Sequence, residues 1–383
     1  MSRLHISFPQ AKEKIFAVCD VGPGCASVAI AQSRGTRSSR VLASGHSKLS
    51  IEEQTPDQAI SLIGGQIKEA AQAALSAYHA QGFSTEINEV EIVVHAPWIK
   101  SSTVESDVSY ENDRNIQDST IGKLAKESLT GATDIDMSTV VEASVIRVEL
   151  NGYPTTQPSG KHARHVRVVS LVGECNRESK GVILSAIQES FPIADIQWRS
   201  GIRALMAVAR QTPTLGENYF IVDIGIDATH IMSVRGAAFE QRVLPGGVRM
   251  ILSHIAAGKS PEATLTSLRM LAVESCSTAE CDALRSAMAI AEQDMVKHFA
   301  EPIGQMAITR RAANNLLLVV HPDLEIWLSQ FFSRIDFSQF TVTTAPFSVS
   351  TPSSIDINRW FDGELSSESL AVGVALVNIE ARS

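Results

Sequence analysis

The sequence predicts an α/β protein built in two halves, with a small α+β module inserted into the first half. Three observations lead to this prediction. Apolar strands alternate with amphipathic helices along the chain. A unit of strand, Asp-x-Gly turn and strand occurs twice, roughly 200 residues apart, which indicates an internal duplication. A polar stretch with strands of its own separates the two units.

The size and composition of the chain indicate several folded domains. Its 383 residues exceed the usual size of one compact core. A hydrophobic fraction of 44% and a charged fraction of 20% exclude a disordered chain. The net charge of -9 opposes nucleic-acid binding, which requires a basic surface. The short basic run at 161–167 is interpreted as the solvated start of a strand.

The cysteines and the hydropathy pattern predict a cytoplasmic protein. The five cysteines are scattered and odd in number, a poor disulfide framework that fits a reducing compartment. Residues Met1 to Lys14 lack the apolar core of a signal peptide. No run of about 18 apolar residues occurs, so no transmembrane segment is expected.

The first half opens with a three-strand meander. An apolar run at 15–19 ends at Asp20, and Gly22-Pro23-Gly24 then forces a turn. Two further strands are predicted at 27–31 and 40–43. Thr55-Pro56 is typical of a helix start, and apolar residues at helical spacing follow it. A buried strand at 90–94 comes next.

The stretch from about 100 to 191 predicts the inserted module. It carries a helical pattern at 121–129, two strands around a Gly/Pro loop, and a closing helix near 181–190. We therefore predict five segments: first domain 1–99, insert 100–192, return to the first domain 193–215, second domain 216–362, and a C-terminal helix 363–383 that returns to the first domain.

The second half repeats the opening pattern and continues mostly as helices. After a short helix at 202–210, a new meander is predicted at 219–222, 229–234 and 237–244. The remaining predicted elements are helices at 247–257, 261–275 and 280–304, a buried strand at 316–320, and helices at 323–334 and 365–378.

The two turns, Asp20-Val21-Gly22 and Asp223-Ile224-Gly225, are the candidate site. Glycine lets the backbone approach an anionic ligand, and a carboxylate at a strand end can hold Mg²⁺ directly or through water. Glycines that lead into a helix suit phosphate or ribose contact. The candidate metal ligands are Asp20 and Asp223, and the candidate phosphate contacts are Gly22, Gly24, Gly225, Thr229, Gly246 and Gly247. No catalytic residue is identified, so at most a weak ATPase activity is expected.

These motifs resemble a known family. The run from Asp223 through Thr229 and Gly236 to Leu244-Pro245-Gly246-Gly247 resembles the second phosphate motif of the FtsA/PilM branch of the bacterial actin-like ATPases. Asp20-Val21-Gly22 is similar to the first, and residues 148–161 resemble the SHS2-like insert domain of that branch. The resemblance implies a two-domain actin-like fold (ribonuclease H-like, duplicated), ATP with Mg²⁺, and a scaffold role at the cytoplasmic membrane face, in cell division or type IV pilus assembly.

Some residues depart from the family pattern. Ile226-Asp227-Ala228 replaces part of the second motif, and the strand at 316–320 runs into His321-Pro322-Asp323 instead of paired glycines. Two alternatives therefore stay open: a scaffold of this fold that binds nucleotide weakly or not at all, and a small-molecule kinase. The chain ends soon after 371–376, which resembles PilM and implies membrane contact through an inner-membrane protein partner. Self-association is a further expectation.

Overall fold

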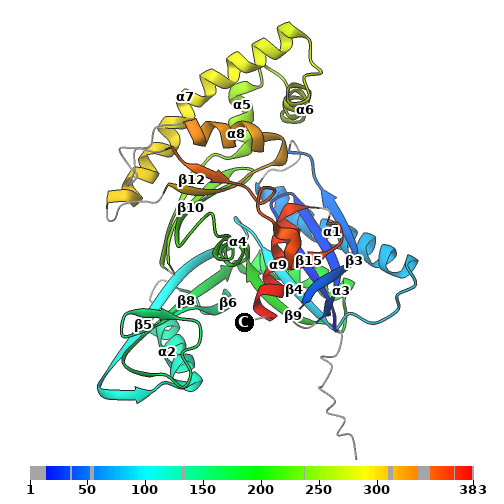
Figure 1. The fold of residues 1–383 in the computed structure, drawn as a ribbon. Helices are drawn as coiled ribbons and strands as arrows, with labels where there is room; N and C mark the ends of the chain where they lie inside the picture. Colours follow the sequence, from blue (N-terminus) through cyan, green and yellow to red (C-terminus); the bar gives the residue numbers. More distant parts are fainter. Residues whose placement is uncertain are drawn as a thin grey trace, which may run out of the picture.

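The computed structural model describes residues 14–34, 37–51, 56–131, 135–236, 238–308, 314–334, 346–365 and 367–381. Two α/β domains are stacked on each other, and a smaller sheet projects from the first of them (Figure 1). The predicted α/β class and duplicated organisation are confirmed.

The first domain is built on a six-stranded sheet in the order β15-β3-β2-β1-β4-β9. β1 to β3 form the predicted antiparallel meander, and β4 lies parallel to β1 because a helical crossover connects them. The strands are β1 Lys14–Gly22, β2 Cys25–Arg34, β3 Arg37–Lys48, β4 Glu89–Val94, β9 Asp195–Ser200 and β15 Phe361–Asp362.

Two pairs of helices cover the faces of this sheet. α1 (Pro56–Ala80) and α3 (Arg177–Ser190) pack on one face. α4 (Gly201–Arg210) and α9 (Glu368–Ala381) lie on the other, in a core that also contains residues of the second domain's sheet. The central residues of α9, 370–376, are all buried, as expected of a helix enclosed between layers.

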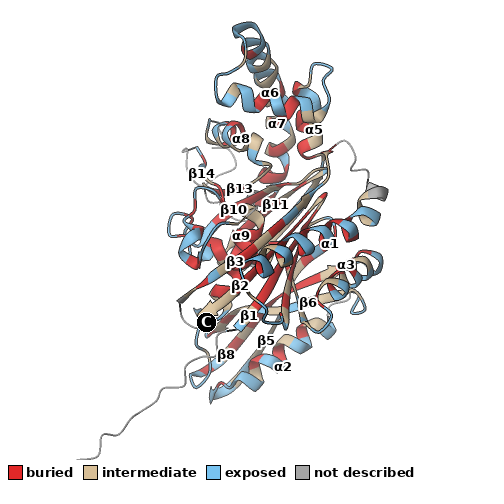
Figure 2. Ribbon diagram, turned by 90° about the vertical axis from the view of Figure 1, so that its right-hand side faces the viewer, coloured by how far each residue is buried: buried red, intermediate tan, exposed pale blue. Residues whose placement is uncertain are grey.

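The second domain repeats the plan with a five-stranded sheet in the order β12-β11-β10-β13-β14. Helices cover its outer face, and the sheets and the inner faces of the helices carry most of the buried residues (Figure 2). The strands are β10 Asn218–Ile224, β11 Ala228–Arg235, β12 Ala238–Pro245, β13 Asn315–Val319 and β14 Ser348–Ser350. The helices are α5 Val248–Ile255, α6 Pro261–Ala272, α7 Thr278–Ile308 and α8 Pro322–Arg334, and a 3₁₀ helix spans Ile357–Trp360.

The insert is a four-stranded antiparallel sheet, β5-β8-β6-β7, with one helix packed on it. Its elements are β5 Ile99–Asn115, α2 Asp118–Gly131, β6 Val140–Leu150, β7 Tyr153–Thr155 and β8 His162–Cys175. β5 was not predicted, because this edge strand exposes polar side chains along most of its length.

Two domain boundaries lie elsewhere than expected. α3 was assigned to the insert, but Ile183, Ala186 and Ile187 pack in the core of the first domain beside α1. The return to the first domain begins before residue 363, because β15 at 361–362 pairs with β3. Thr55, the predicted helix cap, lies outside the described residues.

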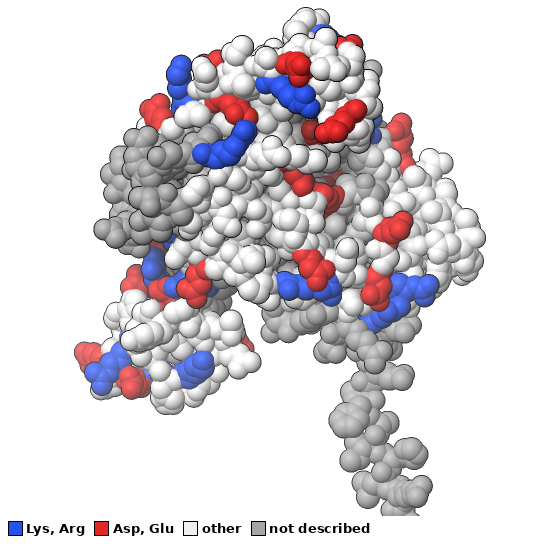
Figure 3. Space-filling model, turned by 45° about the horizontal axis from the view of Figure 1, so that its top comes forward, with Lys and Arg blue, Asp and Glu red and all other residues white. Residues whose placement is uncertain are grey.

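The basic run in the insert is neutralised within its own sheet. Arg164 pairs with Asp113 at 3.2 Å and His165 with Asp107 at 3.2 Å, and Arg167 pairs with Glu105. On the face shown in Figure 3, cationic and anionic side chains are likewise interspersed. The interpretation of this run as a solvated strand is therefore supported.

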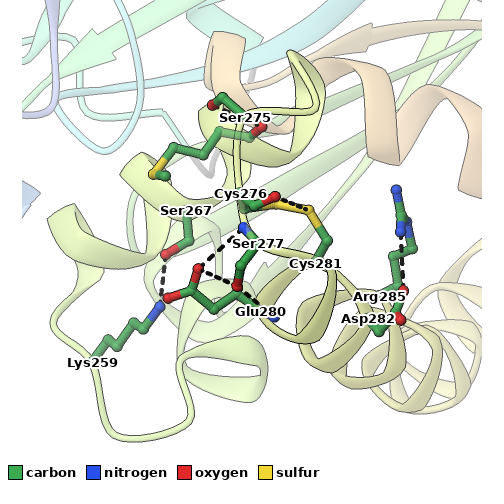
Figure 4. Close-up of a disulfide and its surroundings, with 10 residues drawn as sticks. Lys259, Ser267, Ser275, Cys276, Ser277, Glu280, Cys281, Asp282 and Arg285 are labelled. Carbon is green, nitrogen blue, oxygen red and sulfur yellow. Dashed lines mark hydrogen bonds and ion pairs between the residues drawn. A yellow bond between two sulfur atoms is a disulfide. The ribbon is translucent and has the colours of Figure 1, made fainter.

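The expectation that the cysteines form no disulfide was wrong for one pair. Cys276 and Cys281 are joined across the connection between α6 and α7, with their Cα atoms 5.8 Å apart (Figure 4). Ser277 and Glu280 form a capping box that starts α7. This helix start places Cys276 beside Cys281. The scattered positions of the cysteines in the sequence did not predict this pairing.

Candidate functional site

The structure brings the two Asp-x-Gly turns together between the domains. Asp20 lies near the end of β1 in the first domain, and Asp223 lies near the end of the corresponding strand, β10, in the second. Burial raises the pKa of Asp223 most, and the charge of Asp20 contributes to the rise. The predicted pairing of the turns across the domains is consistent with this geometry.

The carboxylate of Asp20 is enclosed by two partners. It is 2% exposed. Nε2 of His95 lies 2.7 Å from its Oδ1, and the hydroxyl of Ser369 donates to its Oδ2 at 2.7 Å. The Ser369 hydroxyl is also 3.0 Å from Nε2 of His95. Both carboxylate oxygens of Asp20 are thus engaged by side chains from β4's end and from the first turn of α9.

His95 is the site residue that the sequence reasoning missed. Burial lowers its pKa, but the charge of Asp20 and the hydrogen bond to it outweigh burial, and Asp223 adds to them, so the pKa is raised. For Asp223, burial raises the pKa most, while His95 and His230 oppose it. The sequence signal was the position of His95 directly after the buried strand at 90–94, at the same sheet edge as Asp20.

The first turn is shaped by proline and glycine. Gly22 pairs with Cys25, so Pro23 and Gly24 form a two-residue connection. Gly24 has φ +73°, which glycine adopts without strain, and Pro-Gly at these positions is typical of a type II turn. The carbonyl of Gly24 accepts hydrogen bonds from the backbone N–H of Leu49 at 2.9 Å and from the side chain of Gln66 at 3.1 Å.

The second turn is packed against the start of α5. A Cβ on Gly247 would lie 2.1 Å from the carbonyl oxygen of Gly225, so the contact requires glycine. The N–H of Val248 donates to the carbonyl of Gly225 at 2.8 Å, and that of Arg249 to Ile226 at 3.0 Å. The first amides of α5 therefore bind carbonyl groups of the turn.

The other predicted contacts of the second turn are also engaged internally. The N–H of Gly225 donates to Ala228 at 2.9 Å, and the N–H of Gly246 donates to Asp227 at 2.9 Å. Thr229 is fully buried, and its hydroxyl donates to the carbonyl of Gly246 at 2.9 Å. In this arrangement Thr229 stabilises the glycine turn.

Several groups that were expected to bind ATP with Mg²⁺ are engaged by other protein groups in this structure. Phosphate binding at a helix N-terminus requires N–H groups that point at the ligand. At the start of α5, the N–H groups of Val248 and Arg249 donate to protein carbonyls instead. Mg²⁺ is bound in proteins by carboxylate oxygens, directly or through water, and each carboxylate oxygen of Asp20 already has one protein partner. Within the described residues, no group of three or more His, Cys, Asp and Glu side chains is placed to hold a metal ion.

A separate cavity of about 220 Å³ lies where the insert meets the first domain. Trp98 and Lys100, at the start of β5, contribute to it, and Thr139 lines it from the segment before β6. Trp98 is buried and Lys100 is exposed. The remaining lining residues are Pro97, Glu174, Cys175 and Asn176.

No protein-family model and no curated protein sequence matches the chain. Among solved structures, PilM from a PilM–PilN type IV pilus biogenesis complex is 11% identical, covers 97% of this chain and 99% of its own, and has a TM-score of 0.55. A diol dehydratase-reactivating factor in nucleotide-free form is 10% identical, covers 96% of this chain and 100% of its own, and has a TM-score of 0.50. Likeness at such low identity shows the fold, and the chain has the two-domain fold of the actin-like ATPases.

Proposed function

We propose that this chain is an actin-like scaffold that assembles with a membrane-protein partner in type IV pilus assembly. The observation that supports this most is the end-to-end likeness to PilM of a PilM–PilN complex, which extends through both domains and the insert. Among the described helices, none has the length and apolar composition needed to cross a membrane. In this proposal the partner supplies the membrane contact at the cytoplasmic face.

The junction of the insert and the first domain is the surface that we assign to the partner. It offers a cavity with a buried aromatic floor at Trp98 and an exposed cation at Lys100. Buried aromatic anchors beside polar rims are common in protein interfaces. The partner would present an apolar side chain and an acidic group on a short segment.

The test is binding of the purified chain to a peptide from the cytoplasmic tail of a PilN-like membrane protein of the same organism. Lys100→Glu should weaken binding by about tenfold or more, because it reverses the charge at the rim. Lys123→Glu, on the exposed face of α2 with a side chain 77% exposed, is the matched control and should bind as the wild type does. Equal affinity in all three proteins, or none in the wild type, would refute the proposal.

A nucleotide-regulated scaffold is the second candidate. It is favoured by Asp20 and Asp223, which lie near the ends of corresponding strands of the two domains and whose negative charges a divalent cation would neutralise. ATP with Mg²⁺ would first have to displace His95 and Ser369 from Asp20. A ligand at about 100 times its Kd stabilises the native state by roughly 2.7 kcal/mol. A Mg-ATP-dependent rise in Tm that Asp223→Ala abolishes would therefore support this candidate, and no rise would exclude it.

A further inference from the structure

The end of β3 connects the two domains. β3 runs toward the second domain and ends at Lys48 (Figure 1). The next residue, Leu49, is tied to the first candidate phosphate turn, since its N–H donates to the carbonyl of Gly24 at 2.9 Å. Two residues later, Ile51 is completely buried, and it belongs to the core cluster of the second domain together with residues of α5 and α6.

Both backbone groups of Ile51 bind the second domain. Its N–H donates to Oε1 of Glu262 at 3.1 Å, and its carbonyl accepts from Nη1 of Arg249 at 2.7 Å. Nε of Arg249 donates in turn to Oδ1 of Asp227 at 2.8 Å, in the turn between β10 and β11. A continuous series of contacts therefore runs from the first Asp-x-Gly turn, through Leu49 and Ile51, to the second.

A second bridge lies beside the first. Nζ of Lys48 is 3.1 Å from Nε2 of His321, which lies two residues after the end of β13. Burial lowers the pKa of His321 most, and the nearby charge of Lys48 lowers it further. The contact falls at the segment where the family pattern places paired glycines.

We propose that Lys48–Ile51, here called the strap, fixes the angle between the two domains from within the chain. To separate the two turns, the domains would have to expose the side chain of Ile51 and break the hydrogen bonds of its N–H and carbonyl groups. Exposing the apolar side chain and breaking these hydrogen bonds both cost free energy. If a nucleotide determined the angle between the domains, it would bridge the two turns. In this chain the strap bridges them. The inference concerns the fold and is independent of the partner and of its binding surface.

The test compares Ile51→Ala with Ile63→Ala. Both isoleucines have no exposed surface, but Ile63 lies on α1 inside the core of the first domain. Both truncations should lower Tm, because each leaves a cavity. Only Ile51→Ala should increase the radius of gyration measured by small-angle X-ray scattering and accelerate hydrogen exchange at the Leu49 amide by about tenfold or more.

Identical scattering profiles and identical Leu49 exchange in the two variants would overturn the proposal, because Ile51 would then be an ordinary core residue. Lys48→Met covers the case in which Ile51→Ala does not fold, since Lys48 is exposed and its loss leaves the core intact. It should also accelerate exchange at Leu49. Exchange in Lys48→Met that is indistinguishable from the wild type would count against the strap.

Discussion

The carboxylate of Glu142 accepts a hydrogen bond of 2.7 Å from the backbone N–H of Ser200. Glu142 lies on β6 of the insert, and Ser200 is the N-cap of α4 in the first domain. Arg203, one turn into α4, lies 3.4 Å from the same carboxylate and also pairs with Glu380 of α9. A buried carboxyl group thus joins the insert to the first domain.

Replacing Glu142 should destabilise the protein more than replacing an exposed glutamate. Glu142→Ala leaves the Ser200 N–H without its acceptor and removes one partner of Arg203, so we expect a loss of about 1–3 kcal/mol in the free energy of unfolding. Glu127→Ala on α2 removes an exposed i,i+4 pair and should cost at most about 0.5 kcal/mol. Urea denaturation measures both, and equal losses would contradict the anchoring role of Glu142.

Glu91 should make stability depend on pH between about 4.5 and 7. Burial raises its pKa from 4.5 to about 7, and this outweighs the opposing charges of Arg199 and Arg203, while Glu380 and Glu89 raise it further. The unfolded glutamate ionises first, so the native state holds the proton longer and stability falls as pH rises through this window. The fall attributable to Glu91 is at most about 3 kcal/mol.

Glu91→Gln is the matched variant for this effect, because it keeps the shape and removes the titration. Its free energy of unfolding, measured by urea denaturation from pH 4 to 8, should fall less steeply than that of the wild type. The contributions of all other groups are shared by the two proteins. Parallel curves would show that Glu91 titrates normally in the native state.

The two glycines Gly247 and Gly65 should respond in opposite ways to alanine. A Cβ on Gly247 would lie 2.1 Å from the carbonyl oxygen of Gly225, so Gly247→Ala must separate the second turn from α5 and lower Tm. Gly65 is in the interior of α1 with nothing within 4 Å of an added Cβ. Gly65→Ala should stabilise the protein by about 0.5–1 kcal/mol. Thermal unfolding of both variants tests this prediction. An unchanged Tm in Gly247→Ala would refute the close contact.

The fold could be predicted because its determinants are local and repeated. The Asp20 and Asp223 turns each follow an apolar strand, and the meanders built on them have the predicted order and pairing. β5 could not be predicted in the same way, because an exposed edge strand lacks the apolar alternation that identifies strands. α3 was misassigned because its sequence shows an apolar face but not which core that face joins.

The candidate site was predictable only in part. The glycines and aspartates of the turns are visible as motifs, but their hydrogen-bond partners come from distant segments. Ser369, which binds Asp20, is 349 residues away in sequence, and the residue that Arg249 contacts, Ile51, is 198 residues away. Such contacts depend on the tertiary arrangement of the elements, which no local pattern specifies. The same holds for the hydrogen bond from the N–H of Leu49 to the carbonyl of Gly24.

The disulfide between Cys276 and Cys281 gives the last prediction. It closes a loop with a sequence separation of 5 residues. By restricting the unfolded chain, a loop this short should contribute about 2 kcal/mol to stability. Reducing agent should therefore lower the Tm of the oxidised protein.

The double variant Cys276→Ser with Cys281→Ser is the control, since its Tm should match the reduced wild type and should not respond to reductant. The other three cysteines remain in that variant, so a Tm that still falls with reductant would assign the effect to them. Cys19 and Cys175 are buried, and burial raises the pKa of both thiols, which makes them slow to react. Mass spectrometry after alkylation without reduction should accordingly find Cys276 and Cys281 unmodified, and alkylation of both would show that the bond is absent in the purified protein.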